Sequence, residues 1–289
     1  MRNKLVIANR VAAAASPSLG RNLENIFPLC AQEKCSRRHA FLHRLRRRES
    51  GIAFHDRWYC SPECLLPGLQ GVIETMRQVQ LSQRSAAHRM PLGLALVSRG
   101  HLTTDQLRRA LVAQQSAGNG RLGEWLVRLG FTNEAQIVAA LGLQWGCPVF
   151  KLSETHLPDC VGLVPLGLLE AYCVLPVQFV SKTRTLYLGF SSEVDHSLLY
   201  SMEKMVPCKA ECCAISESVV RKLLRVARQE TRLTEIVFDS DCANDELARI
   251  TLAYMVKLGT QAVRVARCGI YLWIRLAGGD QQTDLLFRS

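Results

Sequence analysis

The sequence contains no Gly-Lys pair, because none of its eight lysines follows a glycine. A P-loop needs that pair to bind nucleotide phosphates, so a motor ATPase of this kind is excluded. No apolar run approaches the roughly 20 residues needed to cross a bilayer. Asn9 and Arg10 interrupt the N-terminal apolar stretch before a signal peptide could form. We therefore expect a cytoplasmic chain with no membrane span.

The sequence also lacks a recognisable catalytic grouping. No Ser/His/Asp set, no Cys/His set and no paired carboxylate motif occurs in a local context typical of catalysis. A base-reading helix between Cys and His pairs is absent as well. We expect a protein that is not an enzyme and does not read DNA sequence.

Positive charge is concentrated at the N-terminus. Residues 1–90 hold fifteen Lys and Arg against six Asp and Glu, which leaves only +2 of the net +11 for the remainder. The densest basic run is Arg37–Arg48. Such a run attracts polyanions without sequence preference, and its alternative interpretation is a solvated helical face. We expect non-specific polyanion contact at most.

Cysteines are abundant, and four of the twelve form two close pairs near the N-terminus. The two pairs are Cys30 with Cys35 and Cys60 with Cys64. Four thiolates at this spacing suit a structural, tetrahedral Zn²⁺ site. A predicted hairpin before Cys60 and a helix opening after Ser61 make the segment resemble a treble-clef zinc finger. The alternative is a set of core cysteines without metal.

A tandem repeat occupies residues 91–144 and carries more information than any single motif. Each copy predicts a short helix, a glycine at its C-terminus, a capping box of N-cap-x-x-Gln form and a second helix. Such a pair of hairpins fits packing about a local two-fold and a ligand that is itself two-fold symmetric. The residues that recur thirty positions later are Leu92, Gly93, Leu96, Val97, Gly100, Leu107, Leu111 and Gln114, matched by Leu122, Gly123, Leu126, Val127, Gly130, Ile137, Leu141 and Gln144.

The units 91–114 and 121–144 resemble the paired motifs of the MshE-type N-terminal domain, which is found at the front of type II secretion and type IV pilus assembly ATPases. The family motif begins Arg-Leu-Gly and ends on Gln, and the second copy matches it from Arg121 to Gln144. The first copy has Pro91 in place of the Arg. The resemblance continues to about residue 228.

The resemblance implies cyclic di-GMP as the ligand, because the two motifs bind it together in members of the family that act as receptors. An Arg guanidinium can fork onto phosphate or guanine, and a Gly lets the backbone approach the ligand. The implied nucleotide-binding residues are Leu92, Gly93, Leu96, Gln114, Arg121, Leu122, Gly123, Leu126 and Gln144.

The rest of the chain alternates short apolar strands with amphipathic helices. We expect an α+β fold in which the helical repeat packs on a small α/β layer, with an N-terminal zinc finger and a small C-terminal α/β unit. The expected divisions are a flexible tail, a Cys₄ module, a linker helix, the MshE-type domain and the C-terminal unit, at residues 1–28, 29–67, 68–88, 89–228 and 229–289.

The leading hypothesis is a non-enzymatic regulatory module that binds cyclic di-GMP and acts with secretion or pilus assembly proteins. Two alternatives stay open: a protein–protein adaptor with a degenerate nucleotide site, and a zinc-dependent nucleic-acid-binding protein. Pro91 bears on the choice between them, since the first copy loses a forked guanidinium contact worth about 1–3 kcal/mol.

Overall fold

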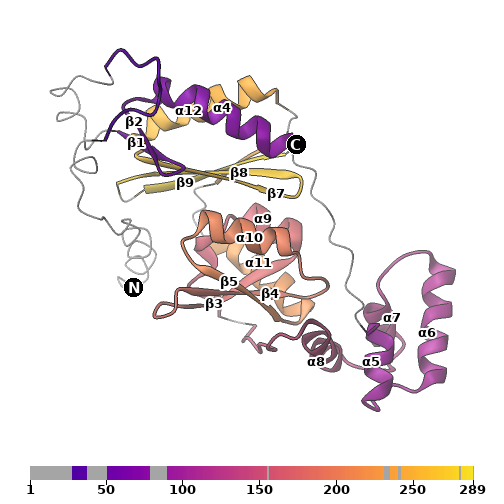
Figure 1. The fold of residues 1–289 in the computed structure, drawn as a ribbon. Helices are drawn as coiled ribbons and strands as arrows, with labels where there is room; N and C mark the ends of the chain where they lie inside the picture. The colour runs from indigo at the N-terminus through magenta and orange to yellow at the C-terminus, as the bar shows by residue number, and fades with distance from the viewer. Residues whose placement is uncertain are drawn as a thin grey trace.

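The computed structural model describes residues 28–37, 51–78, 90–154, 156–230, 235–239, 242–279 and 281–288. The expected tail up to residue 27 and the basic run from Arg38 to Arg48 lie outside the described residues. The described part is a mixed α/β structure with two sheets (Figure 1). Within the described residues, no helix is both long and apolar enough to span a membrane.

A six-stranded sheet combines both ends of the chain. Its order is β2-β1-β7-β8-β9-β6, and β1 pairs in parallel with β7 at Ala53 and Ala262. The predicted hairpin before Cys60 is present as β1 and β2. The cysteine module and the C-terminal unit, which we expected to be separate units, contribute strands to the same sheet. The strands are β1 (Ile52–Phe54), β2 (Arg57–Tyr59), β6 (Glu235–Phe238), β7 (Ala262–Cys268), β8 (Tyr271–Gly278) and β9 (Gln281–Arg288).

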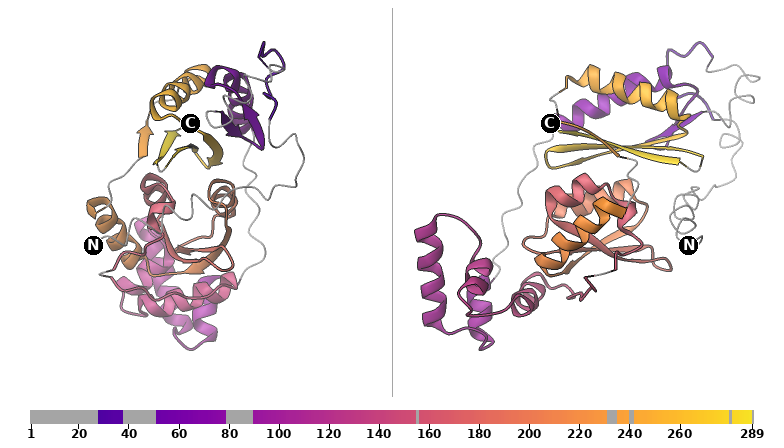
Figure 2. Two further views of the ribbon diagram at one scale, coloured as in Figure 1. Left: turned by 90° about the vertical axis from the view of Figure 1, so that its left-hand side faces the viewer. Right: turned by 180° about the vertical axis from the view of Figure 1, so that it is seen from behind.

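Two helices, α4 (Pro62–Gln78) and α12 (Asn244–Leu258), pack together on one face of this sheet (Figure 2). α4 begins as the sequence predicts, with Ser61 Oγ accepting a hydrogen bond from Cys64 N at 3.4 Å and Pro62 in the first turn. Its apolar stripe is fully buried, and Arg77 Nη1 donates to the Cys242 carbonyl at 2.8 Å. The described part of the helix expected as a linker, residues 68–78, therefore belongs to α4 and packs in the core against the sheet.

The other face of the sheet rests on a second α/β layer, which contains a three-stranded sheet in the order β3-β4-β5. The strands expected at 173–180 and 186–190 and the helices expected at 196–205 and 216–229 are present within one residue. The strand expected at 148–150 is reduced to a single bridge between Val149 and Ala214. The expected helix over 161–171 is divided in two, because Pro165 disfavours helical backbone at Val164. The elements are η1 (Val161–Leu163), α9 (Leu166–Tyr172), β3 (Val174–Val180), β4 (Thr185–Phe190), α10 (His196–Met205), β5 (Lys209–Ala214) and α11 (Glu217–Glu230).

A buried ion pair within the six-stranded sheet also contacts the α/β layer. Arg275 Nε lies 2.7 Å from Asp284 Oδ1, and Arg275 Nη2 donates to the Leu163 carbonyl at 2.9 Å. Trp273, fully buried between the layers, donates its indole N–H to the same carboxylate. Because each partner is hydrogen-bonded, removing one would leave a buried charge uncompensated.

The repeat forms four helices at one end of the molecule (Figure 1). Gly100 and Gly130 follow the first helix of each copy with φ of 71° and 68°, as expected for left-handed positions that favour glycine. Both capping boxes are present: Thr103 pairs with Gln106, and Asn133 with Gln136. The helices are α5 (Leu92–Ser98), α6 (Thr104–Ala117), α7 (Leu122–Arg128) and α8 (Glu134–Trp145).

Candidate functional site

The two copies of the repeat exchange packing partners. α5 of the first copy packs mainly against α8 of the second, and α7 of the second packs mainly against α6 of the first. Exchanging equivalent helices, α5 for α7 and α8 for α6, converts one pair into the other. This exchange is the arrangement that a local two-fold produces.

The glutamine at the end of each copy ties it to the beginning of the other. Gln114 Nε2 donates to the Gly120 carbonyl at 2.8 Å, and Gln144 Nε2 donates to the Met90 carbonyl at 2.7 Å. Gly120 precedes Arg121 as Met90 precedes Pro91, so the two bonds are equivalent. The amides are thus used within the protein, and a contact with a base edge would require them to leave these carbonyls.

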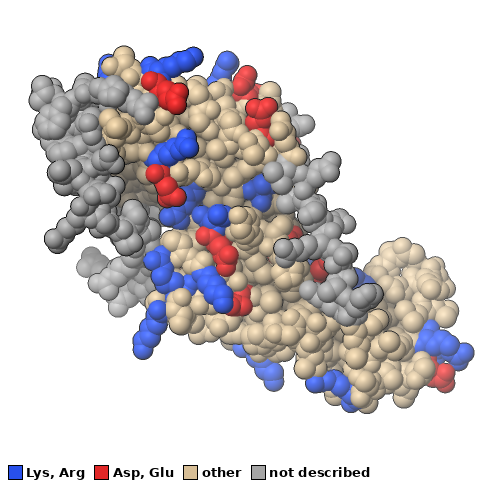
Figure 3. All heavy atoms as spheres, viewed as in Figure 1, with Lys and Arg blue, Asp and Glu red and all other residues tan. Residues whose placement is uncertain are grey.

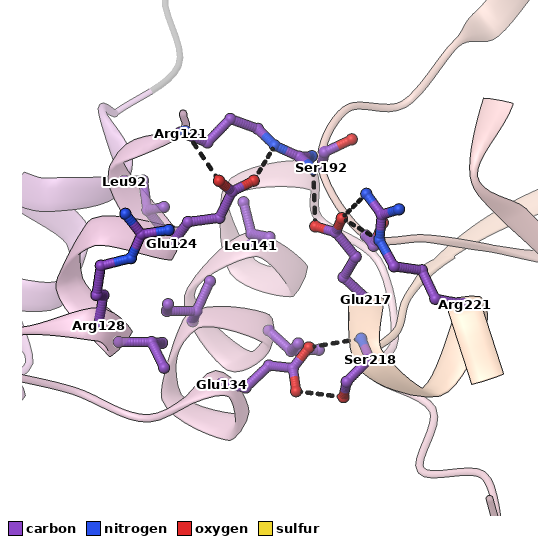
Figure 4. A pocket seen from close by; sticks show the side chains of 15 residues that line it. Leu92, Arg121, Glu124, Arg128, Glu134, Leu141, Ser192, Glu217, Ser218 and Arg221 are labelled. Carbon is purple, nitrogen blue, oxygen red and sulfur yellow. Dashed lines mark hydrogen bonds and ion pairs between the residues drawn. The ribbon is translucent and has the colours of Figure 1, made fainter. Parts of the chain in front are cut away.

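A cavity of about 450 Å³ lies where the second copy faces the α/β layer (Figure 4). Helices of the repeat supply an apolar wall, while α11 and the loop after β4 supply polar groups from the opposite side. The apolar wall includes Leu92, Gly123, Val127, Ile137, Val138 and Leu141. The charged and hydroxyl side chains are Arg121, Glu124, Arg128, Glu134, Ser191, Ser192, Glu217, Ser218 and Arg221.

A chain of alternating charges crosses the mouth of this cavity (Figure 4). Arg121 lies between Glu124 on its own helix, at Nε–Oε1 3.0 Å, and Glu217 on α11, at Nη2–Oε2 2.8 Å. The other Glu217 oxygen, Oε1, accepts from Arg221 Nε at 2.8 Å and from Nη2 at 2.6 Å. The Glu217 carboxylate raises the pKa of Arg221 through these bonds.

Glu134, at the start of α8, reaches across to the start of α11. Its Oε1 accepts from Ser218 N at 2.9 Å and its Oε2 from Ser218 Oγ at 2.5 Å. A carboxylate is stabilised beside helix N-terminal amides, so this contact holds the second copy against the α/β layer. The first copy has Thr104 at the equivalent position and makes no such bond among the described residues.

Only some of the residues predicted to bind the nucleotide line the cavity. Leu92, Arg121 and Gly123 line the cavity together, although they come from different copies. Leu96 and Leu126 are fully buried in the core of the repeat. The others lie away from the cavity wall: Gly93 packs against Leu107, Leu122 is half-buried, and Gln114 and Gln144 bind carbonyls.

Sequence reasoning missed the residues that α11 contributes. Glu217, Ser218 and Arg221 lie about a hundred positions beyond Arg121. The pattern predicted the helix but could not indicate that its first turns face the repeat. Only the tertiary arrangement identifies them as part of the site.

The four predicted metal ligands come together. The Sγ atoms of Cys30, Cys35, Cys60 and Cys64 all lie within 4.8 Å of one another. Cys60 Sγ is 3.7 Å from Cys35 Sγ and 3.6 Å from Cys64 Sγ. A tetrahedral Zn²⁺ with bonds of about 2.3 Å separates its sulfurs by about 3.8 Å. The donor set therefore fits zinc in both chemistry and size.

The backbone prearranges this cluster. Ala31 N donates to the Trp58 carbonyl at 2.8 Å and holds the first cysteine pair against the hairpin. Burial, reinforced by the neighbouring sulfurs, raises the pKa of Cys60. His55 lies on the hairpin outside the cluster, whereas His39 and His43 lie outside the described residues.

Two type IV pilus assembly ATPases are similar in sequence to part of this chain. PilB of Myxococcus xanthus is 36% identical over 87 residues, 30% of this chain and 15% of that protein. PilB of Thermus thermophilus is 28% identical over 115 residues, 39% of this chain and 13% of that protein. The chain thus matches less than a sixth of the length of these relatives. No family model matches it.

Solved structures show a looser likeness. A structure of MshE with cdg is 29% identical and covers 48% of this chain and 99% of that chain, at a TM-score of 0.40. The N-terminal domain of XpsE is 24% identical and covers 50% of this chain and 97% of that chain, at a TM-score of 0.36. Superpositions at such scores are loose, so the likeness depends on sequence.

The fold defines a class of structure: a two-copy helical module packed on an α/β layer, with a cavity between them. Within that class, the chain is similar to N-terminal domains of the MshE/GspE type through its tandem motif, and in sequence to parts of two pilus assembly ATPases.

Proposed function

We propose that this chain is a regulatory module that binds cyclic di-GMP in the cavity between the repeat and α11. We further propose that it acts in the cytoplasm with proteins of a type II secretion or type IV pilus apparatus. The observation that carries the proposal is the cavity itself, because Leu92, Arg121 and Gly123 line it together. The proposed partners follow from the similarity to two pilus assembly ATPases.

The chemistry of the cavity suits such a ligand. Arg121 has a half-exposed guanidinium that can fork onto a phosphate or onto guanine O6 and N7. A Cβ added at Gly123 would lie 3.4 Å from the nearest carbon of Ile137. The missing side chain therefore leaves space for a ligand beside Ile137. The Leu92 and Leu141 side chains offer apolar surface to a base or sugar.

Calorimetry with cyclic di-GMP tests this function directly. The full chain should release or absorb measurable heat and saturate with one ligand per chain. Cyclic di-AMP is the control, because it keeps both phosphates but lacks the guanine O6 acceptor. Absence of heat with cyclic di-GMP at high micromolar concentration would refute the receptor function.

An adaptor function is the second candidate, and a separate observation favours it. The first copy exposes apolar side chains, with Met90 at 56%, Leu94 at 54% and Val112 at 57%. On the face in Figure 3, most of the surface of the repeat carries no charged side chain. Exposed apolar patches are typical of protein contact sites, and we propose that these side chains contribute to one. If calorimetry detects no binding of cyclic di-GMP, the adaptor function predicts that Leu94→Asp weakens binding of a cognate secretion or pilus ATPase.

A structural zinc ion held by the four cysteines completes the proposal. Its part would be to hold the first cysteine pair to the hairpin that begins the six-stranded sheet. Metal analysis of reduced protein should give one zinc per chain. Cys64→Ser should lose it and Cys147→Ser should retain it, since Cys147 lies outside the cluster. Reduced wild-type protein without zinc would refute the site.

A further inference from the structure

Two guanidinium groups converge on one carboxylate at the mouth of the cavity. Arg121 approaches Glu217 Oε2 from the repeat, and Arg221 approaches Oε1 from α11. The Glu217 side chain is 21% exposed, whereas Arg121 and Arg221 are 46% and 60% exposed. The Glu217 carboxylate is thus the more buried group, and the Arg121 and Arg221 guanidinium groups contact it from two different elements.

A phosphate can replace that carboxylate without changing the arrangement. Both groups offer two oxygens on one centre, and Arg forms parallel hydrogen bonds to either. The phosphodiester of the proposed ligand likewise carries its single charge on two non-bridging oxygens, so it can accept from both guanidinium groups at once, as Glu217 does. In the ligand-free protein, Glu217 therefore stands where such an oxyanion would bind.

The first copy cannot supply a second cation. Pro91 occupies the position equivalent to Arg121, and it does not line the cavity. A ligand with two phosphates bound beside the second copy alone would meet one arginine of the repeat head. Arg128 also lines the cavity, but its guanidinium lies over the Trp125 ring at 4.7 Å. Arg221 is therefore the cation that faces Arg121 from a different part of the fold.

We infer that Arg221 of α11 is a ligand-binding residue, and that Glu217 is an internal competitor for the same phosphate position. This inference rests on the proposed function. The ligand site is then formed by two elements, the repeat and α11. Ligand binding displaces Glu217 and breaks the contact between Arg121 of the repeat and Glu217 of α11.

Calorimetry with cyclic di-GMP on four variants of the full chain tests the inference. Arg221→Gln should weaken binding at least tenfold. Arg225→Gln removes the same charge one turn further along α11, outside the cavity lining, and should change the affinity by less than twofold. Glu217→Gln should tighten binding about threefold to tenfold, because the competing charge is gone. Arg121→Gln reports whether the proposed site is used at all.

The outcomes separate the two proposals. If the wild type and Glu217→Gln both fail to bind, the proposed function and this inference are both refuted. If Arg121→Gln loses affinity while Arg221→Gln matches Arg225→Gln, the function stands and the role of Arg221 is refuted. If Glu217→Gln binds more weakly than the wild type, Glu217 supports the ligand and is not its competitor. Equal melting temperatures across the variants would confirm that each chain is folded.

Discussion

The two copies of the repeat share their helices, glycines and capping boxes but present different surfaces. In the second copy Leu141 is 6% exposed, because the copy faces the α/β layer, whereas the equivalent Leu111 is 38% exposed. Four charged residues of the second copy line the cavity, and each has an uncharged equivalent in the first copy. The equivalent pairs are Pro91 and Arg121, Leu94 and Glu124, Ser98 and Arg128, and Thr104 and Glu134.

This comparison shows which positions the fold requires and which are free to vary. The residues shared by both copies are those that bury the inner face or end a helix, such as Leu96 and Leu126. Arg121 and Glu134 of the second copy both contact α11. The first copy carries its charges elsewhere, with Asp105 and Arg108 paired on the exposed surface, and is therefore consistent with a binding surface of another kind.

The largest expected effect tests the shared core. Leu96→Ala and Leu126→Ala each remove a fully buried side chain from equivalent positions. Each should lower the free energy of unfolding by about 3 kcal/mol, through lost burial and a cavity. The two losses should agree within about 1 kcal/mol, as measured by denaturant unfolding followed on the repeat. Leu94→Ala, at a 54% exposed position, should cost less than about 0.5 kcal/mol. Clearly unequal losses would show that the two halves of the core are not equivalent.

The next prediction concerns the heads of the two copies. Arg121→Gln should weaken cyclic di-GMP binding by about ten- to hundredfold, as expected for a lost forked contact of about 1–3 kcal/mol. Pro91→Arg places the missing charge at the equivalent position, where the backbone is similar: φ −56° and ψ 141° at Pro91, and φ −94° and ψ 151° at Arg121. Its affinity should change less than about threefold, because position 91 lies outside the cavity lining.

Pro91→Arg is also the variant that can overturn this picture. A tenfold tightening would mean that the ligand spans both heads, as the family resemblance implies. In that case the cavity beside the second copy would hold only half of the ligand, and the first copy would bind the other half through its own head at position 91.

The same comparison explains what the sequence could predict. The repeat helices, their left-handed glycines and their capping boxes depend on residues within a few positions of one another, and the structure confirms them. The cysteine cluster was also predictable, because metal-ligand spacing is a local pattern. The strands of both sheets follow from runs of apolar residues.

Contacts between distant segments could not be predicted. Nothing near Ala53 indicates that it pairs with Ala262, more than two hundred residues away. The contact of Glu217 with the repeat could not be predicted either. In the sequence, Glu217 and Arg221 have only the spacing of an ordinary i,i+4 pair on a helix. For Leu96 and Leu126 the motif indicated the position, but only the fold shows that they are buried.

The smallest expected effect decides what the terminal glutamines do. Gln114→Ala and Gln144→Ala each remove one hydrogen bond to a carbonyl of the opposite copy. If the amides serve only to join the copies, each substitution should lower the free energy of unfolding by about 1 kcal/mol. Ligand affinity should then change by less than about threefold, because neither side chain lines the cavity. A tenfold loss of cyclic di-GMP affinity in Gln144→Ala, without loss of stability, would instead assign the amide to the ligand. The two hydrogen bonds are equivalent in the fold, but the second copy supplies all of the repeat's cavity lining except Leu92. A loss of affinity confined to Gln144→Ala would therefore show that this amide binds the ligand and does not only join the copies.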